Sequence, residues 1–145
     1  MWPWYTDDTF EQKVKSKKEI EEWSANTNEQ CLLDYQEMLS NFINPETPYS
    51  EILLFMQTGT GKTLASIAIA ENFVRQEGRK VIVLTKNDDL AWNFKNELIS
   101  RCSRYGTEQE IKRHLVGDAA TTKELLRRIK SYSFVSHELF KKNKY

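Results

Sequence analysis

Cysteine is scarce in this sequence. Cys31 and Cys102 are its two cysteines, and their spacing fits neither a metal site nor a redox pair. The pattern argues against a disulfide-built secreted scaffold and predicts reduced intracellular thiols. Long apolar runs are also absent, which argues against a membrane-spanning helix, and the opening stretch MWPWYTDDTF lacks the parts of a signal peptide. We therefore expect an intracellular protein that is neither secreted nor bound to a membrane.

Net charge is absent too, because 21 Lys and Arg balance 21 Asp and Glu, but the charges are unevenly distributed. Residues 1–51 carry four basic against eleven acidic residues, whereas residues 99–145 carry eleven basic against five acidic. A basic C-terminal third suits nucleic-acid binding, since phosphate contacts dominate such affinity. It suits equally well a solvated surface that complements the acidic N-terminal part, and charge alone does not separate the two.

Glycine is rare as well, with five in 145 residues, yet two of the five stand in one stretch, MQTGTGKT, residues 56–63. It matches the end of the P-loop pattern G-x-x-x-x-G-K-[ST], although Met56 replaces the first glycine. Glycines let backbone N–H groups approach a phosphate, while Lys62 would contact the outer phosphates and the Thr63 hydroxyl would ligate Mg²⁺. Lys62 and Thr63 are thus the predicted catalytic residues of a triphosphate site. Its other predicted loop residues are Gln57, Thr58, Gly59, Thr60, Gly61 and Leu64.

The flanks of this loop support the same interpretation. The apolar run Ile52–Met56 is predicted to be a buried strand, and residues 64–77 are predicted to form a helix that ends before Gly78. Val81–Thr85 is predicted to be a second buried strand, which completes a βαβ unit. A plain glycine-rich turn is the alternative, and the agreement of motif and context favours phosphate binding.

The rest of the chain alternates helical and strand patterns. Leu90, Phe94, Leu98 and Ile99 are expected to form the buried stripe of the helix that follows the second strand. These alternating elements predict an α/β fold with a parallel sheet of three strands, covered on both faces. The further helices are predicted over residues 8–23, 28–43, 88–105, 107–115 and 121–131, and the third strand over 132–136.

The acid that would complete an ATPase is missing from the expected place. A P-loop ATPase holds Mg²⁺ with a carboxylate at the end of a later strand. Asp118 has no strand before it, and the run 134–138 places Ser136 and His137 where acids are needed. His114 and His137 lack a Ser or Cys partner pattern, which indicates surface positions rather than catalysis.

Against this background, MQTGTGKT resembles motif I of superfamily 2 helicases, whose first position is often not glycine. The longer run FINPETPYSEILLFMQTGTGKTLASIAIAENF resembles the helicase-type ATPases of nucleocytoplasmic large DNA viruses, including relatives of the poxvirus early transcription factor and nucleoside triphosphatase. TDDTFEQKVKSKKEI resembles their N-terminal arm, and VIVLTKNDDLAWNFKNELISRC resembles their motif Ia. YSFVSHELF resembles the segment before their Walker B strand, so the resemblance covers nearly the whole chain.

The resemblance implies a RecA-like P-loop NTPase fold. It implies a helical N-terminal arm with the adenine-motif helix over residues 1–48 and a partial ATP-binding lobe over 49–145, which ends before motif II. ATP and Mg²⁺ are the implied cofactors. Gln36 is implied to recognise adenine through its amide, for which a plain helix-surface glutamine is the alternative. The residues implied to contact the nucleic-acid backbone are Thr85, Lys86 and Asn87.

The leading hypothesis is the ATP-binding N-terminal portion of a viral, nucleic-acid-dependent ATPase that acts in transcription or genome handling. Without motif II, this portion is not expected to hydrolyse ATP itself. Its implied partners are DNA or RNA, through the full-length protein, and a viral RNA polymerase or transcription complex, in a cytoplasmic viral factory or the virion. The rival hypothesis is a stand-alone scaffold or interaction module with a P-loop fold, for instance in a virion.

Overall fold

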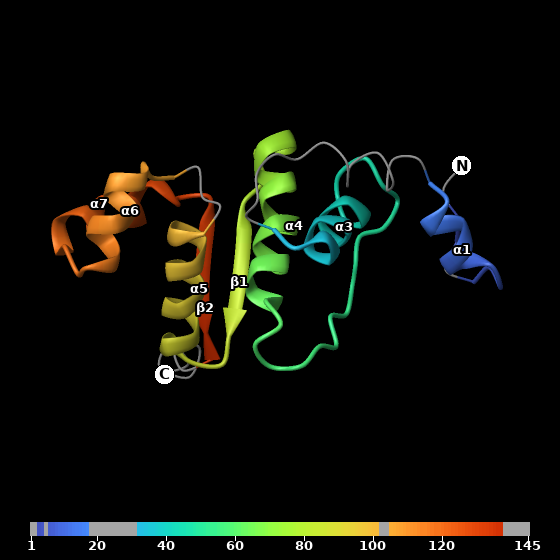
Figure 1. Cartoon of the computed structure of the whole chain (residues 1–145), viewed down its shortest axis with the longest axis horizontal. Coiled ribbons are helices and arrows are strands. Elements are labelled where there is room, and N and C mark those ends of the chain that lie inside the picture. The colour runs from blue at the N-terminus through green and yellow to red at the C-terminus, as the bar shows by residue number, and fades with distance from the viewer. Residues whose placement is uncertain (1–2, 5, 18–31, 102–104, 138–145) are drawn as a thin grey trace, which may run out of the picture. The chain divides into compact units, whose positions relative to one another are not determined.

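The computed structural model describes residues 3–4, 6–17, 32–101 and 105–137, which fall into two compact units, Met1–Glu77 and Gly78–Tyr145. The first unit contains α1 (Phe10–Lys15), α3 (Asp34–Phe42) and α4 (Lys62–Glu77). The second contains β1 (Val81–Thr85), α5 (Asp88–Ser100), α6 (Glu108–Leu115), α7 (Ala119–Arg128) and β2 (Tyr132–Ser136) (Figure 1). The predicted α/β class is confirmed. Cys31, Cys102 and the predicted helical residues 18–23 and 28–31 lie outside the described residues.

In the first unit, α3 and α4 pack against each other. Ser40 Oγ donates a hydrogen bond to the Ala68 carbonyl at 3.4 Å, and the Asn72 amide donates to the Ser40 carbonyl and to Ser40 Oγ, both at 2.8 Å. Burying a large aliphatic side chain stabilises a fold by about 1.5–3 kcal/mol, so the apolar layer here fixes α4 and the start of its first turn. The buried apolar residues of this unit are Ile43, Leu64, Ala65, Ile67 and Val74.

Within the first unit, the N-terminal arm packs against Phe42 and Tyr49 through aromatic rings. Phe10 lies edge-on to Phe42 and Tyr49, with ring centroids 6.3 and 5.9 Å away, and Phe42 stacks on Tyr49 at 4.4 Å. Tyr49 Oη donates to the Pro3 carbonyl at 2.6 Å. Burial, helped by the nearby Asp7, raises the pKa of Tyr49 above its ordinary value. A tyrosine hydroxyl is a hydrogen-bond donor at neutral pH, and the raised pKa acts in the same direction.

In the second unit, β1 and β2 form a parallel pair in register from Val81 opposite Tyr132 to Thr85 opposite Ser136. Both strands were predicted with these bounds, and both are confirmed. β1 is rich in β-branched and aliphatic residues, which favour a pleated, half-buried surface. Helices α5, α6 and α7 lie between the two strands in the chain, as expected for a parallel connection.

Helix α5 covers one face of this pair. Phe94 meets Phe134 of β2 edge-to-face with centroids 5.9 Å apart, and the Lys95 ammonium lies 4.8 Å from the centroid of the Phe134 ring. The prediction that Leu98 and Ile99 are buried is confirmed, but Leu90 is exposed, because Ala91 takes the inward position in the first turn. The buried apolar residues of this unit are Ala91, Leu98, Ile99, Leu125, Ile129 and Tyr132.

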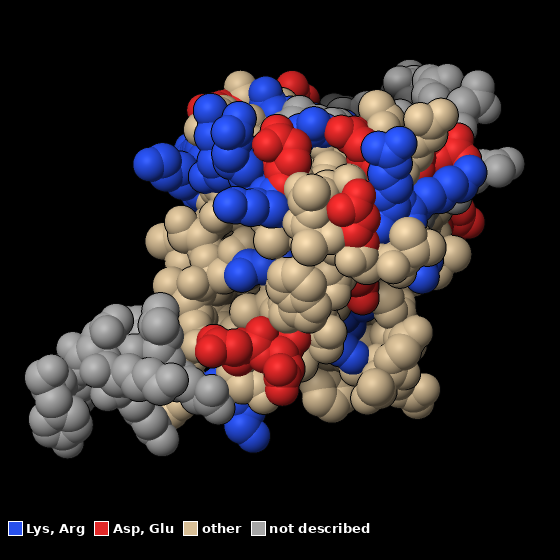
Figure 2. Space-filling view, turned by 90° about the vertical axis from the view of Figure 1, so that its left-hand side faces the viewer, with Lys and Arg blue, Asp and Glu red and all other residues tan. Residues whose placement is uncertain are grey.

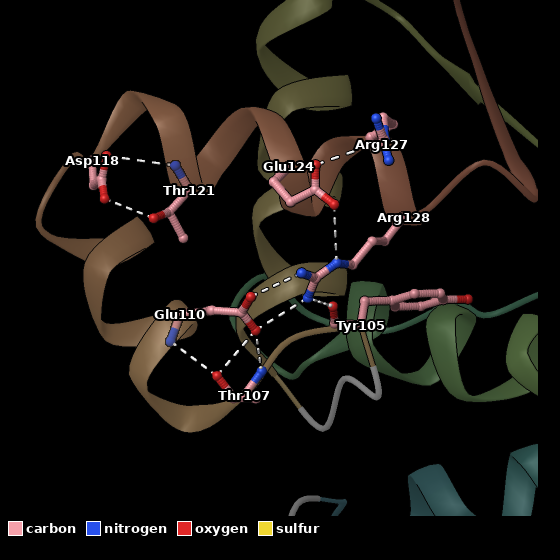
Figure 3. Close-up of polar contacts among 8 residues, drawn as sticks. All are labelled: Tyr105, Thr107, Glu110, Asp118, Thr121, Glu124, Arg127 and Arg128. Atoms are coloured by element: carbon pink, nitrogen blue, oxygen red, sulfur yellow. Dashed lines mark hydrogen bonds and ion pairs between the residues drawn. The ribbon is translucent and has the colours of Figure 1, made fainter.

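Side-chain caps set where α6 and α7 begin (Figure 3). Thr107 Oγ1 accepts from the Glu110 N–H at 3.3 Å, and a Glu110 carboxylate oxygen accepts from the Thr107 N–H at 2.8 Å, which is a capping box. Asp118 accepts from the N–H groups of Ala120 at 3.1 Å and Thr121 at 3.5 Å. Helix α7 therefore begins at Ala119 rather than at the predicted residue 121.

The predicted strand Ile52–Met56 is not formed. This segment is extended without pairing, and the described residues hold two strands, β1 and β2, instead of the predicted three. Leu53 and Phe55 are 91% and 99% exposed, so the expected burial is wrong as well. The reason is physical: a strand exists through its hydrogen bonds to a neighbouring strand, and none of the described residues pairs with this segment.

The prediction of a sheet covered on both faces also needs correction. Side chains alternate across a strand, and the face of β1 that carries Ile82 and Leu84 is exposed. In the described part of the chain, α5 covers the opposite face. No helix among the described residues is long and apolar enough to cross a membrane.

Candidate functional site

The candidate site is the loop that leads into α4. Gly59 and Gly61 both have a φ of +82°, a conformation that residues with a Cβ rarely adopt. α4 begins at Lys62, and the Ala65 N–H donates to the Gly61 carbonyl at 3.0 Å, which closes the first helical turn. A glycine loop that leads directly into a helix N-terminus presents backbone N–H groups to an anion, with the positive end of the helix dipole behind them.

Lys62 lies across this loop. Its ammonium donates to the Met56 carbonyl at 2.9 Å and to the Gln57 carbonyl at 2.6 Å. The Thr60 hydroxyl donates to the same Gln57 carbonyl at 2.7 Å, which closes the turn from the other side. The cation is therefore held at the loop, where the motif requires it for phosphate binding.

The remaining predicted loop residues differ in the exposure of their side chains and in the groups that could contact a ligand. Thr58 and Gln57 are exposed at the tip of the turn. The Thr63 hydroxyl has no hydrogen bond within the described residues, so its oxygen is free to coordinate a metal ion. The Leu64 side chain is buried in the core of the unit, so its contribution to a phosphate site is limited to its backbone.

Two neighbouring side chains of α3 donate hydrogen bonds to backbone carbonyls of the loop. Tyr35 Oη donates to the Thr60 carbonyl, and Gln36 Nε2 donates to the Gly61 carbonyl and to Tyr35 Oη, both at 3.0 Å. Gln36 Oε1 accepts from the Leu33 N–H at 2.9 Å, which caps the start of α3. Gln36 is 1% exposed, and both ends of its amide are engaged with protein.

This arrangement also explains the second glycine of the loop. A Cβ built on Gly61 would collide with Gln36 Nε2 and would lie 3.0 Å from Tyr35 Oη. A Cβ on Gly59 would meet nothing within 4 Å, so at that position only the backbone conformation demands glycine. Sequence reasoning placed Gln36 at the site but missed Tyr35. The available signal was its position beside Gln36 in the run DYQ.

The residues predicted to contact nucleic acid lie in the second unit, at the end of β1 and in the turn that follows it. The Thr85 hydroxyl donates to the Asn87 carbonyl at 2.9 Å, and Asn87 Oδ1 accepts from the Leu90 N–H at 3.0 Å as the N-cap of α5. Lys86 is exposed between them. Thr85 and Asn87 thus shape the turn, and Lys86 is the one of the three that presents a charge to solvent.

The structure does not gather acids for catalysis among the described residues. At the end of β2 it places a buried Ser136 and an exposed His137, while Glu138 lies outside the described residues. In the described ranges, no group of three or more His, Cys, Asp or Glu side chains could hold a metal ion. The prediction of a surface position is wrong for His114, which is buried where its Nδ1 lies 2.8 Å from Thr122 Oγ1.

Three basic residues in the described part of the C-terminal third, Lys112, Arg127 and Arg128, form ion pairs with neighbouring acids. On the face that carries α6 and α7, blue and red side chains are interspersed (Figure 2). Lys112 pairs with Glu108 at 2.6 Å, and Arg127 pairs with Glu124 at 3.7 Å. In these pairs the basic charge is neutralised locally, at side chains that are exposed to solvent.

Arg128 is the centre of the ion-pair network on these helices (Figure 3). Its guanidinium binds the two carboxylate oxygens of Glu110 at 2.9 and 3.1 Å, the Tyr105 carbonyl at 3.1 Å and Glu124 at 3.5 Å. The hydrogen bonds from Arg128, reinforced by those from Thr107, lower the pKa of Glu110 to about 2. The network ties α6 to α7 and is structural.

Comparison with known proteins points in one direction. Residues 29–135 match the family described as "Type III restriction enzyme, res subunit". The chain is 32% identical to "Putative helicase 087L" of Invertebrate iridescent virus 3, across 92% of this chain and 15% of that protein. It is 30% identical to "Putative helicase 009L" of Frog virus 3, across 96% of this chain and 15% of that protein.

A shorter stretch is more similar to a transcription protein. Over 39 residues, which are 27% of this chain and 4% of the relative, it is 59% identical to the "Early transcription factor large subunit homolog" of African swine fever virus (isolate Tick/Malawi/Lil 20-1/1983). The chain thus spans about 15% of the length of the two helicase-named relatives. No solved structure matches it significantly.

Proposed function

The chain belongs to the family of the type III restriction enzyme Res subunit, and on that premise we propose that it binds ATP with Mg²⁺ for a helicase-like, nucleic-acid-dependent ATPase. The loop carries the proposal, because Gly59 and Gly61 have positive φ values that would let backbone N–H groups approach a phosphate, and the Lys62 ammonium is hydrogen-bonded to two carbonyls of the loop. Relatives named as helicases and as an early transcription factor subunit support a role in viral transcription or genome handling.

The partners in this proposal are nucleic acid and a viral transcription complex, in a viral factory or in the virion. Thr63 would ligate Mg²⁺, because its hydroxyl stands in the first turn of α4 beside the loop. For Gln36 to contact adenine, its amide would have to exchange the Gly61 carbonyl and the Leu33 N–H for the edge of the base. Adenine recognition by Gln36 stays a prediction.

The phosphate site is tested by Lys62→Ala. Removing a cation that binds phosphate oxygens should weaken Mg·ATP binding by roughly 10- to 100-fold, as expected for a lost charge-assisted hydrogen bond. Isothermal titration calorimetry of the parent chain and the variant would measure it. Lys13→Ala is the matched control, because Lys13 is in the same unit and pairs with Asp7 at 3.2 Å instead of with the loop.

Equal ATP affinity of the parent and Lys62→Ala would refute the proposed site. If the parent chain itself bound no nucleotide, the rival hypothesis of a scaffold with a P-loop fold would be favoured.

Turnover is a separate part of the proposal. Hydrolysis needs a carboxylate that holds Mg²⁺ and orients water, and β2 ends on Ser136 and His137 instead. We therefore expect the 145-residue chain to bind ATP without releasing phosphate, with or without added nucleic acid. Robust phosphate release by this chain, abolished in Lys62→Ala, would contradict that part and leave the binding site intact.

Nucleic-acid contact is tested at the turn after β1. If Lys86 contacts a phosphate, Lys86→Ala should reduce the slope of log affinity against log salt by about 1. The control is Lys80→Ala, because Lys80 is also exposed but precedes β1 instead of following it. Fluorescence anisotropy with labelled single-stranded DNA and RNA would give both slopes. Identical slopes for the two variants would remove Lys86 from the interface.

A further inference from the structure

We propose that the Tyr35 hydroxyl is a positioning group that, together with Gln36, orients the loop for polyphosphate whatever base the ligand carries. The inference rests on the proposed nucleotide site. Its basis is a pair of hydrogen bonds to successive carbonyls of the loop. Tyr35 Oη donates to the Thr60 carbonyl, and Gln36 Nε2 donates to the Gly61 carbonyl.

The direction of these carbonyls decides where the phosphate-facing groups point. In a trans peptide the C=O and the following N–H point in opposite directions. Holding the Thr60 carbonyl toward α3 therefore turns the Gly61 N–H away from α3. The Gly61 carbonyl accepts from Gln36 Nε2 and also from the Ala65 N–H of α4, so Gln36 and the helix together orient the Lys62 N–H. These are the backbone donors at the start of α4 that would meet a phosphate.

The two side chains act as one unit. Gln36 Nε2 also donates to Tyr35 Oη at 3.0 Å, so the hydroxyl accepts one hydrogen bond while it donates another. Gln36 itself is fixed by the Leu33 N–H and by burial, and the absence of a side chain on Gly61 makes room for both groups. A clamp of this kind acts on the loop backbone, and while the Gln36 amide is bound to the Leu33 N–H and the Gly61 carbonyl it contacts no base.

The test is Tyr35→Phe, which removes the hydroxyl and keeps the ring. Binding of Mg·ATP, Mg·GTP and base-free tripolyphosphate is measured by calorimetry. We expect all three affinities to fall by the same factor, roughly two- to tenfold for one lost hydrogen bond. Tyr49→Phe is the matched control, because it removes a hydroxyl that donates to the Pro3 carbonyl in the same unit, and all three affinities should be unchanged.

A second readout separates positioning from general stability. In ¹⁵N spectra of the ligand-free chain, Tyr35→Phe should shift or broaden the amide signals of Gly61 and Lys62, whereas Tyr49→Phe should not. If Tyr35→Phe fails to fold, Gln36→Met serves instead, because it keeps the side-chain length and removes the amide. It too should weaken tripolyphosphate as much as ATP.

Unchanged affinities in Tyr35→Phe, or a loss confined to ATP, would overturn the inference. A loss confined to ATP in Gln36→Met would also overturn it, and it would favour adenine recognition by Gln36. Failure of the proposed site itself looks different, because Lys62→Ala would then bind all three ligands as the parent does.

Discussion

Ile52–Met56 and Val81–Thr85 have nearly the same apolar character, and they behave differently. ILLFM, in the first unit, is extended and unpaired, with Phe55 almost fully exposed. VIVLT, in the second unit, is β1, because Tyr132–Ser136 lies beside it in parallel register and Phe94 of α5 packs over that neighbour. An apolar run therefore forms a strand only when another backbone segment pairs with it. A local sequence pattern does not show whether such a segment is present.

The largest expected difference between the two units is tested by truncating one side chain to alanine in each. Leu98→Ala removes a side chain that is 1% exposed in the second unit, and it should cost about 2–5 kcal/mol of unfolding free energy. Phe55→Ala removes a side chain that is 99% exposed, and it should change stability by less than about 0.5 kcal/mol. Urea denaturation followed by circular dichroism would compare the two. A large cost for Phe55→Ala would mean that Ile52–Met56 is buried in solution.

A smaller difference in stability is expected at the N-termini of two helices, one in each unit. Thr107 accepts a hydrogen bond from the Glu110 N–H as the N-cap of α6 in the second unit, and Thr107→Ala should cost about 1 kcal/mol. Thr9 is the N-cap residue of α1 in the first unit but makes no side-chain cap, so Thr9→Ala should cost little. Thermal unfolding would measure both. Equal losses of stability in Thr107→Ala and Thr9→Ala would contradict the difference between the two N-caps.

The smallest expected effect is a pH dependence. The pKa of Glu110 is lowered from 4.5 to about 2, chiefly by the Arg128 hydrogen bonds. A lowered folded pKa means that this stabilisation is fully present above the ordinary value and is lost as pH falls toward 2. Glu110→Gln should therefore destabilise the chain at neutral pH and differ less from the parent below about pH 3. The effect is modest, because the pair is partly exposed and salt screens it.

Thermal midpoints of the parent and Glu110→Gln across that range would test this prediction. A difference that stayed constant with pH would assign it to the capping geometry instead of the charge. Lys112 and Glu108 provide a comparison pair on the same helix, because their contact at 2.6 Å is more exposed.

Much of the fold was predictable because its signals are local. α4 lies between a glycine loop and Gly78, whose φ of +61° suits a helix end. β1 and β2 were predicted to the residue, since each is a short apolar or aromatic run bounded by polar residues. The start of α7 was missed because the prediction did not use Asp118 as a cap, although its carboxylate accepts from the N–H groups of Ala120 and Thr121.

At the candidate site, the residue types of the loop were predictable and their neighbours were not. Gly59, Gly61 and Lys62 follow from a motif whose members are adjacent in sequence. Tyr35 stands 25 residues before Thr60, and its contact exists because α3 packs on α4, which is a tertiary event. For the same reason, the burial of His114 depends on packing that its own sequence neighbourhood does not reveal.

The hydrogen bonds that fix the Lys62 ammonium to the loop would change the entropy of the proposed ligand binding. Ordering a lysine side chain costs up to about 2 kcal/mol, and here that cost falls on folding, since the Met56 and Gln57 carbonyls already fix the ammonium. A polyphosphate would exchange the partners of an ordered cation instead of immobilising a free one. The selectivity of the loop among anions would then follow from how well their oxygens replace those two carbonyls.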